Sequence, residues 1–81
     1  MITVQVKLFA TLRRYRPGLK MGQVLAVELP AGATVGQLIR ELGLPEEEVR
    51  MVFVNGLVRE RDHPLADGDE VGIFPPVGGG E

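Results

Sequence analysis

The residues with the plainest chemical potential are the last ones of the sequence, FPPVGGGE, at positions 74–81. A packed domain gains little from three consecutive glycines, because glycine loses more backbone entropy on ordering than any other residue. Such a run is explained if Gly78, Gly79 and Gly80 thread, extended, into a slot on another protein that is too narrow for side chains. Residues 75–80 would reach roughly 20 Å at about 3.3 Å per residue, which is enough to enter a partner's active site.

Glu81 follows these glycines and complicates that interpretation. A tail of this kind would normally present the free carboxylate of its last glycine. Here the carboxyl group of Gly80 forms a peptide bond with Glu81 instead. Three explanations stay open: a protease removes Glu81, the protein is a paralogue that carries nothing, or Glu81 does not belong to the natural chain. Direct use of the Glu81 carboxylate is disfavoured, because its side chain would have to pass the slot.

Composition limits the class of protein. With 81 residues, 44% of them apolar and 25% charged, the chain has the balance of one small globular domain. Nine basic and eleven acidic residues give a net charge of −2, so we expect no nucleic-acid partner. The absence of cysteine excludes disulfides, thiolate metal sites and thiol nucleophiles. The sequence shows neither a signal-peptide pattern nor the roughly 20 apolar residues of a membrane span, so we expect a cytoplasmic protein.

Short strands are predicted on both sides of a single helix. The first alternates apolar and polar side chains, as a half-buried strand does, and Asn55-Gly56 is a strong signal for a two-residue hairpin turn. Between the first two strands lies a basic loop, residues 13–22, with four of the nine positive charges. Pro75-Pro76 ends the last strand by removing backbone donors. The predicted strands cover residues 2–8, 24–29, 51–54, 57–60 and 70–74.

The predicted helix begins after Thr34. Thr34 and Gln37 have the spacing of a capping box, in which each side chain accepts a hydrogen bond from a free backbone N–H at the helix start. Gly43 can end the helix in the left-handed conformation. One helix on one mixed sheet predicts an α+β roll, with the folded domain over residues 1–75 and an extended tail over residues 76–81. The apolar stripe of the helix consists of Val35, Leu38, Ile39 and Leu42.

Together these elements and the glycine tail resemble the β-grasp fold of ubiquitin, and the whole chain is similar to the MoaD/ThiS family of bacterial and archaeal sulfur carriers. The run from DGDEV to FPPV-x-GG is specific when it lies at a C-terminus. Within the family the chain looks most like MoaD, the small subunit of molybdopterin synthase, where Pro-Pro-Val precedes the final glycines. The matching segments are LFATLR, VNG, DHPLADGDEV and FPPVGGG, at residues 8–13, 54–56, 62–71 and 74–80.

The resemblance implies a protein co-substrate rather than an enzyme acting alone. In such carriers an adenylating enzyme of the MoeB/ThiF type uses ATP and magnesium to activate the C-terminal glycine carboxylate. Adenylation supplies the leaving group that a carboxylate lacks, and sulfur from a persulfide then displaces AMP to leave a glycyl thiocarboxylate. Alignment of FPPV-x-GG places this chemistry at Gly80, with Gly79 as the other functional glycine and Gly78 at the variable position. The chain itself would bind no cofactor and no metal.

The resemblance also implies partners. A MoaE-like large subunit would receive the tail, and the sulfur would go to a cyclic pyranopterin to build the dithiolene that holds molybdenum or tungsten. Exposure of Gly80 would require a protease that removes Glu81. Two alternatives stay open: a ThiS-like carrier for thiazole or another sulfur pathway, and a ubiquitin-like binding or modifier protein that carries no sulfur.

Three phenylalanines are expected on the face of the sheet that is turned away from the core. Strand alternation turns Phe53 and Phe74 away from their buried neighbours, and Phe9 has the opposite parity to the apolar residues of the first strand. An exposed apolar patch of this kind usually marks an interface. We therefore predict that Phe9, Phe53 and Phe74, with Val58, bind both the adenylating enzyme and the large subunit. The alternative is that a bulge turns one or more of them inward.

The remaining polar features carry weaker signals. The basic loop could steer an acidic partner or contact phosphate, although such clusters are more often solvated. His63 lies in a turn with no visible catalytic partner, so we interpret it as structural or exposed. Glu46–Glu48 is explained by the favourable placement of negative charge at a helix N-terminus, without a metal. No P-loop, nucleophile–base pair or metal-ligand spacing is present in the sequence.

Overall fold

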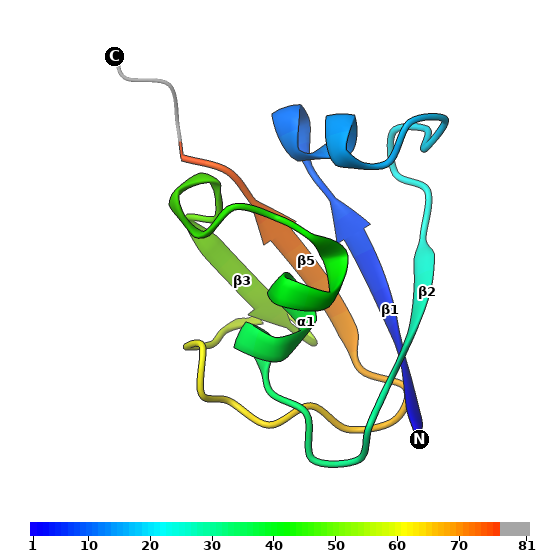
Figure 1. The fold of residues 1–81 in the computed structure, drawn as a ribbon, viewed down its shortest axis with the longest axis vertical. Coiled ribbons are helices and arrows are strands. Elements are labelled where there is room, and N and C mark those ends of the chain that lie inside the picture. The colour runs from blue at the N-terminus through cyan, green and yellow to red at the C-terminus, as the bar shows by residue number, and fades with distance from the viewer. Residues whose placement is uncertain (77–81) are drawn as a thin grey trace.

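The computed structural model describes residues 1–76, so the glycines at 78–80 and Glu81 lie outside the described part of the chain. A five-stranded mixed sheet carries one α-helix and two short 3-10 helices (Figure 1). The elements follow the predicted order of two strands, a helix and three strands. Their bounds are β1 Ile2–Leu8, η1 Ala10–Tyr15, β2 Leu25–Leu29, α1 Val35–Leu42, η2 Glu46–Glu48, β3 Met51–Val54, β4 Leu57–Val58 and β5 Glu70–Phe74.

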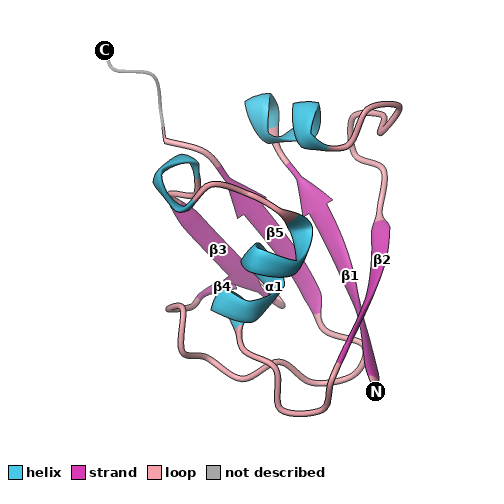
Figure 2. Ribbon diagram, in the orientation of Figure 1, coloured by secondary structure: helices cyan, strands magenta, loops and turns pink. Residues whose placement is uncertain are grey.

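The order of the strands across the sheet differs from their order along the chain. It runs β2-β1-β5-β3-β4, so the last strand lies in the centre, parallel to β1 and antiparallel to β3. Helix α1 packs across one face of this sheet, as Figure 2 shows. This arrangement confirms the predicted α+β roll. It also places the end of β5, where the tail begins, between the end of β1 and the start of β3.

The core lies between α1 and the face of the sheet that the helix covers. Every second residue of the central strands points into it, which is the expected pattern for a sheet with one buried face. Val6 of β1, Ile73 of β5 and Ile39 of α1 are completely buried. Leu25 and Val27 of β2 are half-buried and pack against this core.

The predicted caps of α1 are confirmed. The Thr34 backbone N–H donates to Gln37 Oε1 at 2.8 Å, and the Gln37 N–H donates to Thr34 Oγ1 at 3.3 Å. Gly43 ends the helix with a φ of 73°, in the left-handed region that favours glycine. These bonds satisfy backbone groups that the helix cannot pair internally.

We expect Thr34→Ala to lower the free energy of unfolding by about 1 kcal/mol, because the substitution removes one acceptor of the capping box. Chemical denaturation measures the change. Thr11→Ala is the matched control, since Thr11 is exposed in η1 and its hydroxyl bonds no other residue among 1–76. Its effect should stay within about 0.5 kcal/mol. Equal effects of the two substitutions would contradict a stabilising cap.

Two segments differ from the prediction. The expected basic loop starts later than residue 13, because η1 covers residues 10–15. In this helix Leu12 is fully buried, and its N–H donates to the Phe9 carbonyl at 3.1 Å. The return strand of the hairpin ends at Val58 rather than at residue 60. The chain turns away there to run past the first turn of α1, where the Arg61 carbonyl accepts from the Gly36 N–H at 2.9 Å. Within residues 1–76, no helix is long and apolar enough to cross a bilayer.

Candidate functional site

The candidate site is the outer face of the sheet, the face opposite α1. Strand register sets one row across it: Lys7 of β1 pairs with Gly72 of β5, Gly72 pairs with Phe53 of β3, and Phe53 pairs with Val58 of β4. The next pair of β5 and β3 on this face is Phe74 and Met51. An apolar surface therefore runs over strands that are distant in the sequence.

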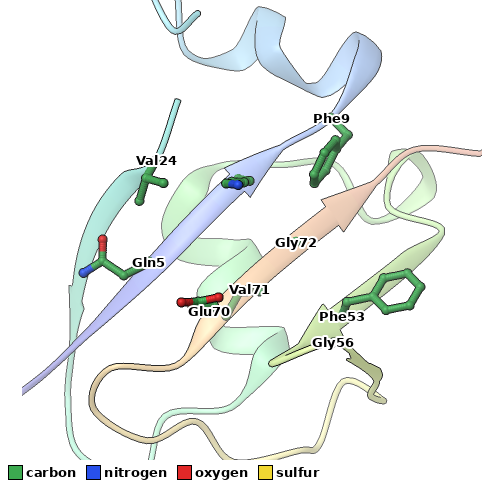
Figure 3. A pocket seen from close by; sticks show the side chains of 9 residues that line it. Gln5, Phe9, Val24, Phe53, Gly56, Glu70, Val71 and Gly72 are labelled. Carbon is green, nitrogen blue, oxygen red and sulfur yellow. The ribbon is translucent and has the colours of Figure 1, made fainter. Parts of the chain in front are cut away.

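Phe9, Phe53 and Phe74 form an aromatic cluster at the end of this face where β1 and β5 finish. The rings of Phe9 and Phe74 are stacked, with centroids 4.1 Å apart and planes 4° apart. Phe53 meets Phe74 edge to face at 5.4 Å. Gly72 lies between Phe9 and Phe53, as Figure 3 shows, and a Cβ there would come within 3.3 Å of Phe9 Cε2. The absence of a side chain at position 72 thus leaves room for the stack.

The structure places the four residues predicted to bind partners on one face and brings the three rings together. None of the rings turns inward at a bulge, and Val58 lies beside Phe53 with 51% of its surface exposed. Their role in binding stays a prediction. Sequence reasoning missed Met51, whose side chain is 41% exposed next to Phe74. The alternation of β3 places Met51 on the same face as Phe53, so the sequence could have indicated it.

The aromatic cluster lies at the root of the tail. The carbonyl of Ile73 accepts from the Phe9 N–H at 3.1 Å, and the carbonyl of Phe74 accepts from the Arg50 N–H at 2.8 Å. Neighbours on both sides therefore hold β5 up to its last residue. Pro75 and Pro76 follow, and neither has an N–H with which to continue the ladder. The predicted reactive residue Gly80, and Gly78 and Gly79, which were predicted to thread into the partner, lie beyond the described part of the chain.

An ion pair joins η1 to η2 at the end of the sheet where β5 finishes (Figure 1). Arg14 Nη2 donates to both carboxylate oxygens of Glu48, at 2.7 and 2.9 Å. The Tyr15 hydroxyl and the Glu48 carboxylate hold the pKa of Arg14 above its ordinary value, so this guanidinium stays charged. Arg14 is thereby engaged within the domain, which leaves fewer free charges in the basic segment than the sequence suggested.

His63 contributes its backbone to the fold. Its carbonyl accepts from the Val35 N–H at the start of α1, at 3.0 Å, and its side chain is half-buried. Glu46–Glu48 form η2, and the Glu46 carboxylate accepts a hydrogen bond from Arg61 Nε at 3.1 Å. Among residues 1–76, no three histidine, aspartate or glutamate side chains gather closely enough to hold a metal ion.

Comparison with known proteins supplies context for this face and for the tail. A model of the ThiS family matches residues 6–80. The molybdopterin synthase sulfur carrier subunit of Escherichia coli is 51% identical over 35 residues, a stretch that covers 43% of this chain and 43% of that protein. The match thus spans less than half the length of this curated relative.

Two solved structures resemble the whole fold. The putative molybdopterin converting factor subunit 1 of Pyrococcus furiosus superposes with a TM-score of 0.77 at 35% identity, over 95% of this chain and all of that one. The small archaeal modifier protein 1 of Haloferax volcanii gives a TM-score of 0.75 at 25% identity, with the same coverage. These likenesses confirm the predicted β-grasp fold. The family match also extends through all three glycines of the tail.

Proposed function

Because this chain belongs to the ThiS family, we propose that it is a sulfur carrier of molybdopterin biosynthesis. The observation that carries the proposal is the extent of the family match, which includes the tail up to Gly80. The names of the Escherichia coli and Pyrococcus furiosus relatives support the molybdopterin pathway. Both relatives are described as subunits, which supports a role for this chain as one subunit of a synthase rather than as an enzyme by itself.

The proposed chemistry takes place at the carboxyl carbon of Gly80 after hydrolysis of the Gly80–Glu81 peptide bond. A partner enzyme with ATP and magnesium joins the carboxylate oxygen to AMP and releases pyrophosphate. The terminal sulfur of a persulfide then attacks the same carbon and AMP leaves, which gives an acyl disulfide with the sulfur donor. A thiol reductant cleaves its S–S bond and forms a new disulfide with the donor, so the Gly80 carbon keeps the terminal sulfur in place of one oxygen. The thiocarboxylate afterwards gives its sulfur to a pterin precursor held by the large subunit. This chain contributes reach and the labile sulfur.

The outer face is the proposed docking surface for both partners. Phe74 is at once part of the aromatic cluster and the last residue of β5, two residues before the described part of the chain ends. A partner that covers the cluster therefore lies next to the first residues of the tail. Because the adenylating enzyme and the large subunit would use the same rings, each would exclude the other, and the carrier would have to leave one before it meets the next.

Intact-mass spectrometry of the protein isolated from its native source tests the proposal. We expect a chain that ends at Gly80, together with a second species heavier by the difference between one sulfur and one oxygen atom. The heavier species should disappear when the adenylating enzyme is deleted. A chain that always retains Glu81 and never gains the sulfur would overturn the carrier function.

A binding or modifier protein is the second candidate. The Haloferax volcanii relative, which is named a modifier, supports it at lower identity. In that case the native protein would be found joined to other proteins through its tail, or bound to them without a change of mass. A ThiS-like carrier for thiazole would show the same sulfur gain as the first candidate. Deletion of this carrier would then leave molybdenum-enzyme activity unchanged.

A further inference from the structure

The last strand is held at its end by one backbone hydrogen bond on each side. On the side of β1, Phe9 donates its N–H to the Ile73 carbonyl at 3.1 Å. On the side of β3, Arg50 donates its N–H to the Phe74 carbonyl at 2.8 Å. The two prolines that follow have no N–H with which to continue the ladder, so these bonds mark the point from which the tail starts.

An ion pair connects the two segments that make these bonds. η1 begins directly after Phe9, and only Val49 separates η2 from Arg50. Arg14 of η1 bonds Glu48 of η2, with Nη2 at 2.7 and 2.9 Å from the two carboxylate oxygens. Figure 1 shows the short blue helix after β1 and the short green helix before β3 on either side of the chain that leaves β5. The pair therefore closes a ring of contacts around the end of β5, which we name the β5 clamp.

The ion pair is better fixed than most pairs on a protein surface. The Tyr15 hydroxyl accepts from the same Arg14 Nη2 at 3.3 Å, and the guanidinium carbon lies 5.2 Å from the centroid of the Tyr15 ring. The Glu48 side chain is only 30% exposed. Both short helices are anchored in the core, because Leu12 of η1 and Val49 after η2 are buried. Exposed pairs contribute little when two long side chains must first be ordered, and that cost is reduced here.

We propose that Arg14 and Glu48 are positioning residues, which through the β5 clamp keep the last residues of β5 in place before a partner takes up the tail. The inference rests on the proposed function, in which the tail threads into a slot. A segment that becomes ordered only on binding loses its conformational entropy at that moment, which weakens the affinity. A fixed root confines this loss to the residues beyond it. The argument holds for any partner that takes up the tail.

Amide hydrogen exchange of the free carrier, followed by NMR, tests the clamp itself. Arg14→Ala and Glu48→Ala should each speed the exchange of the Phe9 and Arg50 amides about two- to fivefold, because local opening of the end of β5 no longer has to break the ion pair. Unchanged exchange at these two amides in both variants would overturn the clamp.

The start of β5 supplies an internal control for this measurement. There the Gln5 N–H donates to the Asp69 carbonyl at 2.8 Å, and the Asn55 N–H donates to the Glu70 carbonyl at 2.7 Å. These bonds hold the strand from the same two sides, but at the end far from the ion pair. Exchange of these amides should not change. Equal acceleration at both ends of β5 would indicate a general loss of stability and would overturn a local clamp.

Loading of the chain that ends at Gly80 by the adenylating enzyme tests the positioning role. In Arg14→Ala and Glu48→Ala the KM for the carrier should rise about two- to fivefold. The kcat should stay within about twofold, because the enzyme itself orders the tail once it is bound. Arg40→Ala and Glu41→Ala are the matched controls, since they change the net charge equally at exposed positions of α1 whose side chains form no ion pair within residues 1–76. Their KM should equal that of the unaltered carrier.

Arg14→Lys separates the ion pair from the shape of the arginine. A single nitrogen of Arg14 makes both bonds to Glu48, so one lysine ammonium can replace it. We expect this variant to restore both the slow exchange and the low KM. Failure of the lysine to restore them would contradict a role for the ion pair.

The two measurements distinguish this inference from the proposed function. If the alanine variants exchange faster at the end of β5 but keep the KM of the unaltered carrier, the clamp exists and its positioning role is wrong. If the unaltered chain that ends at Gly80 is not loaded at all, the proposed function is overturned and the positioning role with it. Hydrogen exchange then still decides whether the ion pair holds the end of β5.

Discussion

A chain shortened by one residue, so that Gly80 carries the free carboxylate, is expected to accept sulfur in a reconstituted reaction in which the full-length chain stays unloaded. The adenylating enzyme acts on a terminal carboxylate, and in the full chain the corresponding carbon of Gly80 belongs to an amide. The carboxylate of Glu81 lies one residue further along and is accompanied by a side chain that glycine lacks. Mass spectrometry after incubation with ATP, magnesium and a persulfide donor measures the loaded fraction.

The test compares three chains, which end at Gly79, Gly80 and Glu81. A chain that ends at Gly79 also has a free glycine carboxylate, but its reactive carbon is withdrawn by about 3.3 Å. We expect it to be loaded at least about 100-fold more slowly than the chain that ends at Gly80, because a displacement of about 1 Å already costs that much in a positioned reaction. Equal loading of the full-length chain would contradict the need to remove Glu81. Equal loading of the two shortened chains would contradict a fixed length of slot.

The elements that local physics determines could be predicted from the sequence. Helix α1 begins after Thr34 and ends before Gly43, as the capping box and the left-handed glycine required. The bounds of β1 agree with its alternation. Each of these features depends on residues within a few positions of one another, so no knowledge of the rest of the fold was needed.

The remaining features depend on contacts between distant segments. The 3-10 helix η1 exists because Leu12 reaches the core beneath the end of β1, and the spacing of Leu12 and Tyr15 was its only local signal. The neighbours of Gly72 across the sheet could not be predicted either. β5 inserts between β1 and β3, which places Gly72 between Lys7 and Phe53. Strand parity showed which face the phenylalanines occupy, but not which residues lie next to them.

Phe74→Glu is expected to abolish binding of both partners while the domain stays folded. Phe74 is the ring that contacts both other members of the aromatic cluster, stacked on Phe9 and edge to face with Phe53. A carboxylate at this position would be buried without a partner charge when the docking face is covered. Central anchor residues of an interface contribute about 2 kcal/mol or more, so we expect an affinity loss of at least about 100-fold.

The domain should tolerate this substitution because Phe74 does not belong to the core. The ring is half-buried on the outer face, whereas Ile73 beside it points inward and is completely buried. Loss of two aromatic contacts is expected to lower the free energy of unfolding by about 1–3 kcal/mol. Circular dichroism and thermal unfolding would show whether the variant stays folded at the temperature of the binding measurement.

Ala26→Glu is the matched control for this prediction. Ala26 is exposed on the same face, opposite Gln5 on the edge strand β2, and the substitution changes the net charge by the same amount. If charge on the face as a whole opposed docking, both variants would lose affinity equally. If the aromatic cluster is the anchor, only Phe74→Glu loses it, and Phe74→Leu, which keeps an apolar side chain but no ring, should fall between the two. If a folded Phe74→Glu variant binds both partners normally, the aromatic cluster does not contribute to docking. The partners would then have to recognise the glycines alone.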